Sequence, residues 1–150
     1  MSTNDVDNWA TMLIEDLRAG RAHRALWGDA GQEPPSLDDA YLLQDAVLAG
    51  LSDLRGGVGG YKVAITAKPM QEMMGLTAPL GGLVHAGDIH AAPFTLSMAA
   101  FQTPALEFEV TVRIGTDVPL SGVPYDRATI APFVGEVLTS FEIVDTRGAA

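Results

Sequence analysis

Residues 104–114 read Pro-Ala-Leu-Glu-Phe-Glu-Val-Thr-Val-Arg-Ile, and from Leu106 onward apolar and polar side chains alternate strictly. Successive side chains of a strand point to opposite faces, so this pattern predicts a strand with one face packed on a core. The β-branched and aromatic residues of the stretch favour the same assignment. The apolar face consists of Leu106, Phe108, Val110, Val112 and Ile114, and the polar face of Glu107, Glu109, Thr111 and Arg113.

The polar face of this strand carries two carboxylates, Glu107 and Glu109. Residues two apart in a strand have Cα atoms about 7 Å apart and side chains on the same side. Two like charges so placed repel each other unless a cation lies between them, and Mg²⁺ and Mn²⁺ prefer carboxylate oxygens. The alternative is that both glutamates simply form the solvated face of an antiparallel sheet.

Composition limits the classes of function. With 150 residues, 47% of them apolar, the chain is long enough for one globular domain with a core. A net charge of −10 argues against a nucleic-acid partner, and the absence of cysteine excludes disulfides and thiolate chemistry. The polar, acidic N-terminus and the lack of a long apolar run predict a soluble cytoplasmic protein with no membrane partner.

Two helices are predicted before the first strand. The apolar stripe Trp9, Leu13 and Leu17 predicts a helix over residues 9–27, capped by Asp7 or Asn8. Gly20 weakens this helix, and the alternative is that residues 21–27 form a separate turn. A second helix runs from a Ser36 cap to about Leu54. The glycines of residues 56–60 end that helix and do not form a phosphate loop, because a helix precedes them and a strand follows. We expect His23, Arg21 and Arg24 to be solvated.

The rest of the chain predicts short elements. We expect strands over residues 61–66 and 138–144, a short helix over residues 70–74 and a helix start over residues 125–131. Residues 76–92 are predicted to be a long loop, with His85 and His90 as ordinary loop histidines. Three methionines are predicted to fill gaps in the core: Met70, Met73 and Met74.

A third carboxylate, Glu142, stands between Phe141 and Ile143 in the strand predicted over residues 138–144. Burial there is costly for a carboxylate without a partner. Together with Glu107 and Glu109 it is sufficient for an open octahedral site that water or substrate completes. The pattern of elements predicts an α+β fold with a helical region over residues 1–55 and a β-rich core over residues 56–150.

Four segments in order carry a resemblance to a known family: Asp39-Ala40-Tyr41-Leu42-Leu43-Gln44, Gly60-Tyr61-Lys62-Val63-Ala64-Ile65-Thr66, Leu106-Glu107-Phe108-Glu109-Val110 and Phe141-Glu142-Ile143-Val144-Asp145-Thr146-Arg147. Together they resemble the 2-keto-4-pentenoate hydratase and 4-oxalocrotonate decarboxylase branch of the fumarylacetoacetate hydrolase superfamily. The resemblance implies N-terminal helices followed by a mixed, barrel-like β core. Family members continue past the Asp-Ser/Thr-Arg motif, so the resemblance also implies that this core is incomplete in the chain.

The resemblance also implies a site and an activity. Glu107, Glu109 and Glu142 correspond to ligands of Mg²⁺ or Mn²⁺, and Lys62 to a catalytic lysine that faces the substrate. The implied activity is that of a metal-dependent lyase in aromatic catabolism, which hydrates a 2-hydroxypenta-2,4-dienoate type of substrate, a short 2-oxo acid. The alternative is a 4-oxalocrotonate type of decarboxylase. Leu80 stands where family members often carry an acidic or aromatic residue, so no second acid or base is predicted.

Three hypotheses follow for the chain as a whole. The first is an active or incomplete lyase of this type. The second is a non-catalytic subunit that partners a full-length homologue, and both agree with a homo-oligomer or a hetero-oligomer because a lone half would leave sheet edges and apolar faces uncovered. The third is a plain acidic α+β domain whose glutamates are only solvated.

Overall fold

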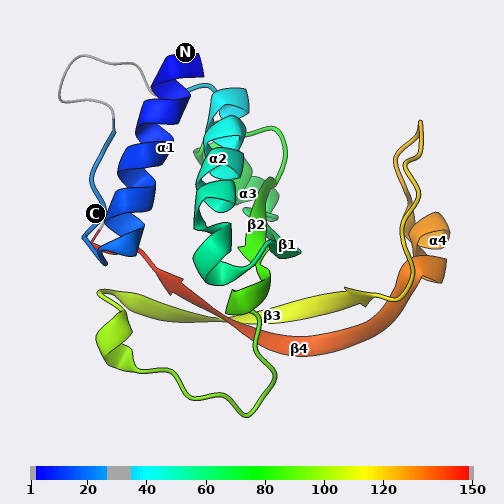
Figure 1. The fold of residues 1–150 in the computed structure, drawn as a ribbon. Coiled ribbons are helices and arrows are strands. Elements are labelled where there is room, and N and C mark those ends of the chain that lie inside the picture. Colours follow the sequence, from blue (N-terminus) through cyan, green and yellow to red (C-terminus); the bar gives the residue numbers. More distant parts are fainter. Residues whose placement is uncertain (1–2, 27–34, 149–150) are drawn as a thin grey trace. The chain divides into compact units, whose positions relative to one another are not determined.

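The computed structural model describes residues 3–26 and 35–148 (Figure 1). The described chain divides after Ala100 into two compact units, which are treated separately below. The first unit holds the helices α1, α2 and α3 and the strands β1 and β2. The second unit holds β3, α4 and β4. The division predicted after residue 55 stays a prediction.

The core of the first unit lies between α1 (Thr3–Arg18) and α2 (Leu37–Arg55). Its buried residues come from both helices and from the segment that follows α1: Val6, Ala10, Leu26 and Leu43. The helix predicted over residues 9–27 is therefore present but displaced. Asp7 and Asn8 lie inside α1 rather than at its cap, and the helix has ended before Gly20, which has a positive φ of 62°. Residues 21–26 form no helix, and Trp27 lies outside the described residues.

The segment after α1 is held to the helix by charge. Asp16 is buried, and its carboxylate pairs with Arg21 at 2.5 Å and with Arg24 at 2.6 Å. The hydrogen bond from Arg21 and the positive charges of both arginines lower the pKa of Asp16 below its ordinary value. Arg21, Arg24 and His23 are exposed, as predicted, but the two arginines also neutralise a buried acid.

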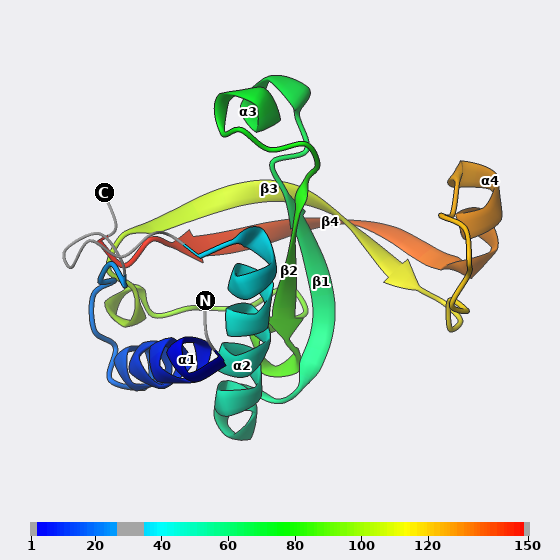
Figure 2. The same cartoon turned by 90° about the horizontal axis from the view of Figure 1, so that it is seen from above.

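The second predicted helix is confirmed in α2. The Ser36 hydroxyl accepts the Asp39 N–H at 3.1 Å, and the helix ends at Gly56, whose φ is +75°. Two residues of α2 also hold β2 (Leu80–His85): the Tyr41 hydroxyl accepts the Gly81 N–H at 3.0 Å, and Gln44 accepts the Leu83 N–H at 2.7 Å. Figure 2 shows α2 lying beside β2.

The first sheet pairs β1 (Val58–Ala64) with β2 in antiparallel fashion. The prediction of a long loop over residues 76–92 is thus wrong for residues 80–85. Glycines suggested a loop there, but in the sheet Gly82 lies opposite Lys62, and the lysine stem occupies the space that a Cβ would fill. His85 ends this strand and is buried, with Nδ1 2.8 Å from the Gly56 carbonyl oxygen, so it is not a loop histidine.

The short helix predicted over residues 70–74 is confirmed as α3 (Lys68–Met73), with Pro69 in its first turn. Its methionines are not core residues. Met70, Met73 and Met74 are 45%, 74% and 54% exposed.

The second unit is a long antiparallel hairpin of β3 (Pro104–Ile114) and β4 (Val134–Asp145). It confirms the strand over residues 104–114 and contains the strand predicted over residues 138–144. The connection includes the one-turn helix α4 (Arg127–Ile130), capped by Asp126, and a 3₁₀ turn (Ala131–Phe133).

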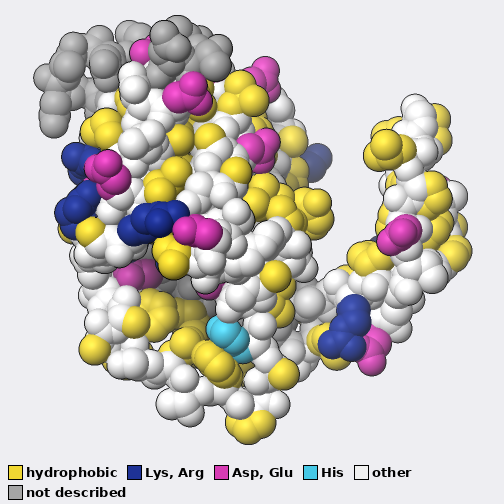
Figure 3. Space-filling model, viewed as in Figure 1, with side chains coloured by type: hydrophobic (Ala, Val, Ile, Leu, Met, Phe, Trp, Pro, Cys, Tyr) yellow, Lys and Arg dark blue, Asp and Glu magenta, His cyan; other side chains and the backbone are white. Residues whose placement is uncertain are grey.

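The apolar face of the hairpin is not covered within this unit, contrary to the prediction that it packs on a core. Phe108 is 81% exposed and Val110 is 71% exposed, and Phe108 packs edge-on against Phe141 across the strands. Figure 3 also shows hydrophobic side chains at the surface of the β3–α4 connection, where Leu120 and Val123 are exposed.

The described strands form two separate two-stranded antiparallel sheets. The predicted mixed, barrel-like β core is therefore not closed within residues 3–26 and 35–148, although the α+β class and the N-terminal helices are confirmed. Over the same residues, no helix combines the length and the apolar character needed to cross a membrane.

Candidate metal centre

The hairpin brings the three predicted glutamates together. Its register places Glu107 directly opposite Glu142, and Glu109 lies on the same face of β3, opposite Ser140. One carboxylate oxygen of each glutamate lies within 4.8 Å of the corresponding oxygen of the other two. The three charges converge because the strands are antiparallel and the residues occupy neighbouring rungs of one face.

The spacing of these oxygens suits a divalent cation. Around an octahedral ion with oxygen ligands at about 2.1 to 2.4 Å, two ligand oxygens lie about 3 to 5 Å apart. Glu107 and Glu109 are exposed and Glu142 is half-buried, so solvent or a ligand can reach the centre. Without a cation, like charges directly opposite one another destabilise a sheet. The donor set, three carboxylates and no nitrogen or sulfur, suits Mg²⁺, Mn²⁺ or Ca²⁺.

Polar residues continue along the same face of the hairpin. The Thr111 and Ser140 hydroxyls form a hydrogen bond at 2.6 Å, and Arg113 forms an ion pair with Glu136 further along. These partners did not emerge from the sequence, because they depend on the pairing of the two strands. Once Glu107 is placed opposite Glu142, however, Ser140 must lie opposite Glu109 and Glu136 opposite Arg113.

The third carboxylate of β4, Asp145, closes the end of the hairpin near the glutamates. It accepts backbone N–H groups from Thr103 at 2.9 Å, Arg147 at 2.9 Å and Gln102 at 3.1 Å. The N–H of Thr103 is the main cause that holds the pKa of Asp145 below its ordinary value, and the N–H groups of Arg147 and Gln102 add to it. The Thr103 hydroxyl also bonds the Thr146 hydroxyl at 2.6 Å.

The predicted catalytic residue, Lys62, lies on β1 in the first unit. It is exposed, and its aliphatic stem runs over Gly82 of β2. The glutamates belong to the second unit, so the structure brings the three predicted metal ligands together, whereas the role of Lys62 stays a prediction.

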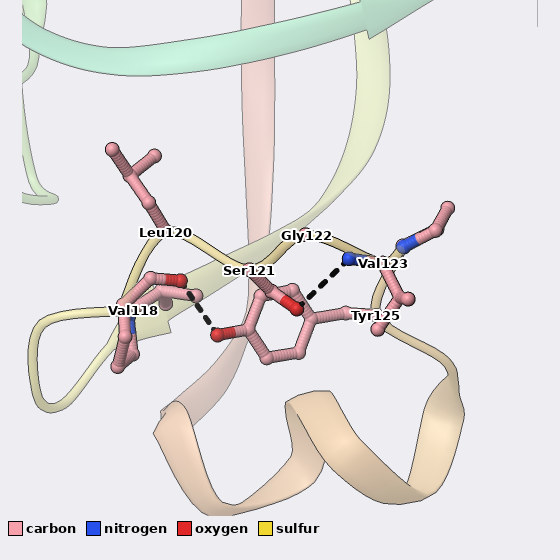
Figure 4. A pocket seen from close by; sticks show the side chains of 8 residues that line it. Val118, Leu120, Ser121, Gly122, Val123 and Tyr125 are labelled. Carbon is pink, nitrogen blue, oxygen red and sulfur yellow. Dashed lines mark hydrogen bonds between the residues drawn. The ribbon is translucent and has the colours of Figure 1, made fainter.

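Other candidate groups lie elsewhere in their units. His90 is exposed and stacks on Phe94 with ring centroids 3.7 Å apart. A shallow hollow in the β3–α4 connection is lined by residues 118–125, none of which is charged (Figure 4). Its polar atoms are used locally: the Tyr125 hydroxyl donates to the Pro119 carbonyl at 2.6 Å, and the Ser121 hydroxyl accepts the Val123 N–H at 3.2 Å. The hollow therefore offers no chemistry comparable to that of the glutamates.

No protein-family model matches the chain, and no curated protein matches its sequence. Two solved structures of 4-oxalocrotonate decarboxylase from Pseudomonas putida G7 are similar in fold, one complexed with calcium and acetate and the other with magnesium and adipate. Each has a TM-score of 0.81 and 18% sequence identity over 98% of this chain.

The match covers 55% of one decarboxylase chain and 54% of the other, so this chain spans about half the length of the structures that it resembles. At 18% identity the likeness establishes the fold alone. At the level of the fold, it agrees with the likeness to 4-oxalocrotonate decarboxylases that the sequence predicted.

Proposed function

We propose that Glu107, Glu109 and Glu142 bind one divalent cation and that the chain acts as a metal-dependent lyase, or as part of one. The observation that carries the proposal is the convergence of three carboxylate oxygens within 4.8 Å, on residues that the sequence resemblance singled out independently. The third hypothesis, glutamates that are only solvated, accounts for a pair on one strand but gives no reason for a third carboxylate opposite them.

The proposed cation is Mg²⁺ or Mn²⁺. Magnesium and calcium accompany carboxylate ligands in the two similar decarboxylase structures, which supports a hard cation with oxygen donors. Such a cation, when bound, supplies a Lewis acid that stabilises negative charge developing on the oxygens of a 2-oxo acid. The glutamates fix its position, and their exposure leaves room for a small carboxylate ligand.

Lys62 is proposed as the group that moves a proton during the reaction. Hydration of a dienoic acid needs one proton delivered to carbon and one removed from water, and a lysine within reach of the substrate can carry it. Lys62 and the glutamates belong to different units of the chain. The support for this role is therefore the family resemblance. The same residue serves a decarboxylase equally well, since loss of CO₂ also leaves a carbon that must be protonated.

The proposed substrate is a short 2-oxo or 2-hydroxydienoic acid, and the proposed reaction is hydration of a 2-hydroxypenta-2,4-dienoate type of compound in aromatic catabolism, in the cytoplasm. Decarboxylation of a 4-oxalocrotonate type of compound is the alternative, and the names of the similar structures favour it. Incubation with each class of substrate, followed by measurement of released CO₂ and of loss of the diene absorbance, separates the two reactions.

A second candidate function is that of a subunit that partners a related, longer chain, or a second copy of itself. The exposed apolar face of the hairpin favours it. The mass of the purified chain in solution, alone and mixed with a full-length hydratase, tests this candidate. A monodisperse monomer that turns over substrate by itself would exclude the subunit role.

Titration with Mn²⁺ by calorimetry tests the proposed metal centre directly. Wild-type protein should bind one ion, and the double variant Glu107→Gln/Glu109→Gln should lose binding, because two of three charged ligands become neutral amides of similar size. The variant Glu136→Gln is the matched control, since Glu136 lies on the same hairpin face but pairs with Arg113. Absence of binding to the wild type at millimolar Mn²⁺ would refute the metal centre.

A further inference from the structure

The two ends of the hairpin are fixed differently. At the end near the glutamates, Pro104 lies opposite Asp145, and proline has no N–H to donate to the strand ladder. The side chain of Asp145 compensates: its Oδ1 accepts the N–H groups of Thr103 and Arg147, and its Oδ2 accepts that of Gln102. These contacts, here called the Asp145 clasp, tie the residues before β3 to the end of β4 on one carboxylate.

At the opposite end of the hairpin, a single backbone hydrogen bond, from the Gly115 N–H to the Phe133 carbonyl at 2.8 Å, joins the two segments in place of a carboxylate clasp. The connection runs from residue 115 to residue 133, too long for the turn geometry that fixes the register of short hairpins. The pairing also shifts between Arg113 and Ile114, where the strands are irregular. The carboxylate at the other end of the hairpin therefore makes more register-specific hydrogen bonds than the connection does.

The register decides whether the metal centre exists. Glu107 lies three residues after Pro104, and Glu142 lies three residues before Asp145, so the two face each other only while Pro104 and Asp145 are paired. A slip of one residue moves every side chain of one strand to the opposite face. It would place Phe141 or Ile143 opposite Glu107, and the third carboxylate would leave the site.

We propose that Asp145 is a positioning residue of the metal centre: its clasp holds the register that places Glu142 opposite Glu107. This inference rests on the proposed metal-binding function. Because the clasp and the bound cation require the same register, each stabilises the other, and the coupling is reciprocal. Loss of the clasp weakens metal binding, and metal binding protects the clasp.

The experiment has two arms on the full chain. In the first, Mn²⁺ affinity is measured by calorimetry for wild type, Asp145→Ala and Asp145→Asn. We expect Asp145→Ala to weaken binding about tenfold, within the range usual for coupled sites. Asp145→Asn should retain much of the affinity, because its amide oxygen can still accept from Thr103 and Arg147 while only the Gln102 bond is lost.

The matched control for the first arm is Asp126→Ala. Asp126 also accepts two backbone N–H groups, from Ala128 at 2.9 Å and Thr129 at 2.8 Å, but it caps α4 in the connection between the strands. Loss of the Asp126 carboxylate removes similar hydrogen bonds from the same unit but leaves the pairing of Pro104 with Asp145 intact. Mn²⁺ affinity should therefore stay at the wild-type value in Asp126→Ala.

The second arm needs no variant, so it decides the matter even where Asp145→Ala does not fold. Amide exchange is followed by NMR on wild-type protein with and without Mg²⁺. We expect the Gln102 and Thr103 amides to exchange several-fold more slowly when Mg²⁺ is bound, whereas the Ala128 and Thr129 amides keep their rates. A merely structural clasp would be indifferent to the cation.

The outcomes separate this inference from the proposed function. Wild-type protein that binds no cation refutes both. Wild-type protein that binds Mn²⁺, with clasp amides indifferent to Mg²⁺ or with Asp145→Ala at wild-type affinity, refutes the positioning role and leaves the metal centre intact. An equal loss of affinity in Asp126→Ala also overturns it, because the effect would then be one of general stability.

Discussion

Replacement of Glu107 by glutamine should change the stability of the hairpin in opposite directions with and without metal. Glu107 has two like-charged neighbours, Glu109 and Glu142, whose carboxylate oxygens lie within 4.8 Å. At this distance each pair of charges repels by about 1 kcal/mol in water. The substitution removes both repulsive interactions at once. Because salt at 0.1 M screens part of this repulsion, the metal-free hairpin should be stabilised by about 1 kcal/mol.

Bound metal reverses the order of stability of wild type and Glu107→Gln. A cation at a concentration 100 times its dissociation constant stabilises the native state by about 2.7 kcal/mol. Wild-type protein gains this amount, whereas Glu107→Gln, which has lost one charged ligand, gains little. The wild-type hairpin should therefore be more stable than the variant by about 2 kcal/mol at saturating Mg²⁺.

The assay must report on the hairpin, because both tryptophans, Trp9 and Trp27, lie outside it. Hydrogen exchange of the peptides that cover β3 and β4, measured by mass spectrometry, gives the free energy of opening of these strands. MgCl₂ is compared with NaCl at equal ionic strength, so that screening is the same in both samples.

Glu136→Gln is the control for this prediction as well. Glu136 is paired with Arg113, so its neutralisation should cost up to about 1 kcal/mol without metal instead of stabilising the hairpin. It should leave the response to Mg²⁺ intact. The reasoning is refuted if Glu107→Gln destabilises the metal-free hairpin, or if the variant gains as much from Mg²⁺ as wild type does.

Three further predictions concern other parts of the chain. Lys62→Ala should abolish turnover while Mn²⁺ binding in calorimetry is retained, because Lys62 is not among the three proposed ligands. Gly59→Ala should destabilise the first unit by about 1 to 3 kcal/mol in urea unfolding, because its Cβ would lie 2.4 Å from the Ala86 Cα, whereas Gly57→Ala meets no atom within 4 Å and should be near neutral. The pKa of Asp145 is depressed in the folded state, so this carboxylate should stabilise the hairpin fully above its ordinary pKa of 3.8. The stabilisation should be lost as the pH falls through the lower folded-state pKa. Hydrogen exchange of β3 and β4 should show this acid transition in wild type and not in Asp145→Asn.

The elements that the sequence predicted well are those set by local pattern. Strict alternation over residues 104–114 is enough to define β3, and the Ser36 cap followed by Asp39 is enough to start α2. The three carboxylates could also be selected from the sequence, because a glutamate between Phe141 and Ile143 alternates with apolar residues in the same way as Glu107 does.

The parts that the sequence did not predict depend on contacts between segments. Gly81 and Gly82 indicated a loop, yet they form a strand. In α2, the Tyr41 hydroxyl accepts the Gly81 N–H and Gln44 accepts the Leu83 N–H, and Lys62 fills the space over Gly82. The buried state of Asp16 depends on two arginines that lie beyond the end of its helix. None of these contacts produces a periodic pattern within one segment, so the sequence pattern does not predict them.

The apolar face of the hairpin shows the limit of such pattern arguments. The alternation predicts that one face of β3 avoids water, but it does not identify the partner that covers this face. Within its own unit, Phe108 and Val110 are exposed. Exposed faces of this kind mark surfaces for association. This is the physical ground on which an oligomer, or a pairing with a longer chain, is proposed.

The division of the chain separates two questions that a single activity assay would merge. All three glutamates and the Asp145 clasp belong to residues 101–148, so cation affinity depends on the register of one hairpin. Turnover by the proposed mechanism requires more, because the proposed proton carrier, Lys62, belongs to the first unit. An inactive chain that binds Mn²⁺ would therefore retain an assembled metal centre and lack the rest of its pocket, as expected of a subunit that needs a partner. An inactive chain that binds no cation would show instead that the three carboxylates never formed a site.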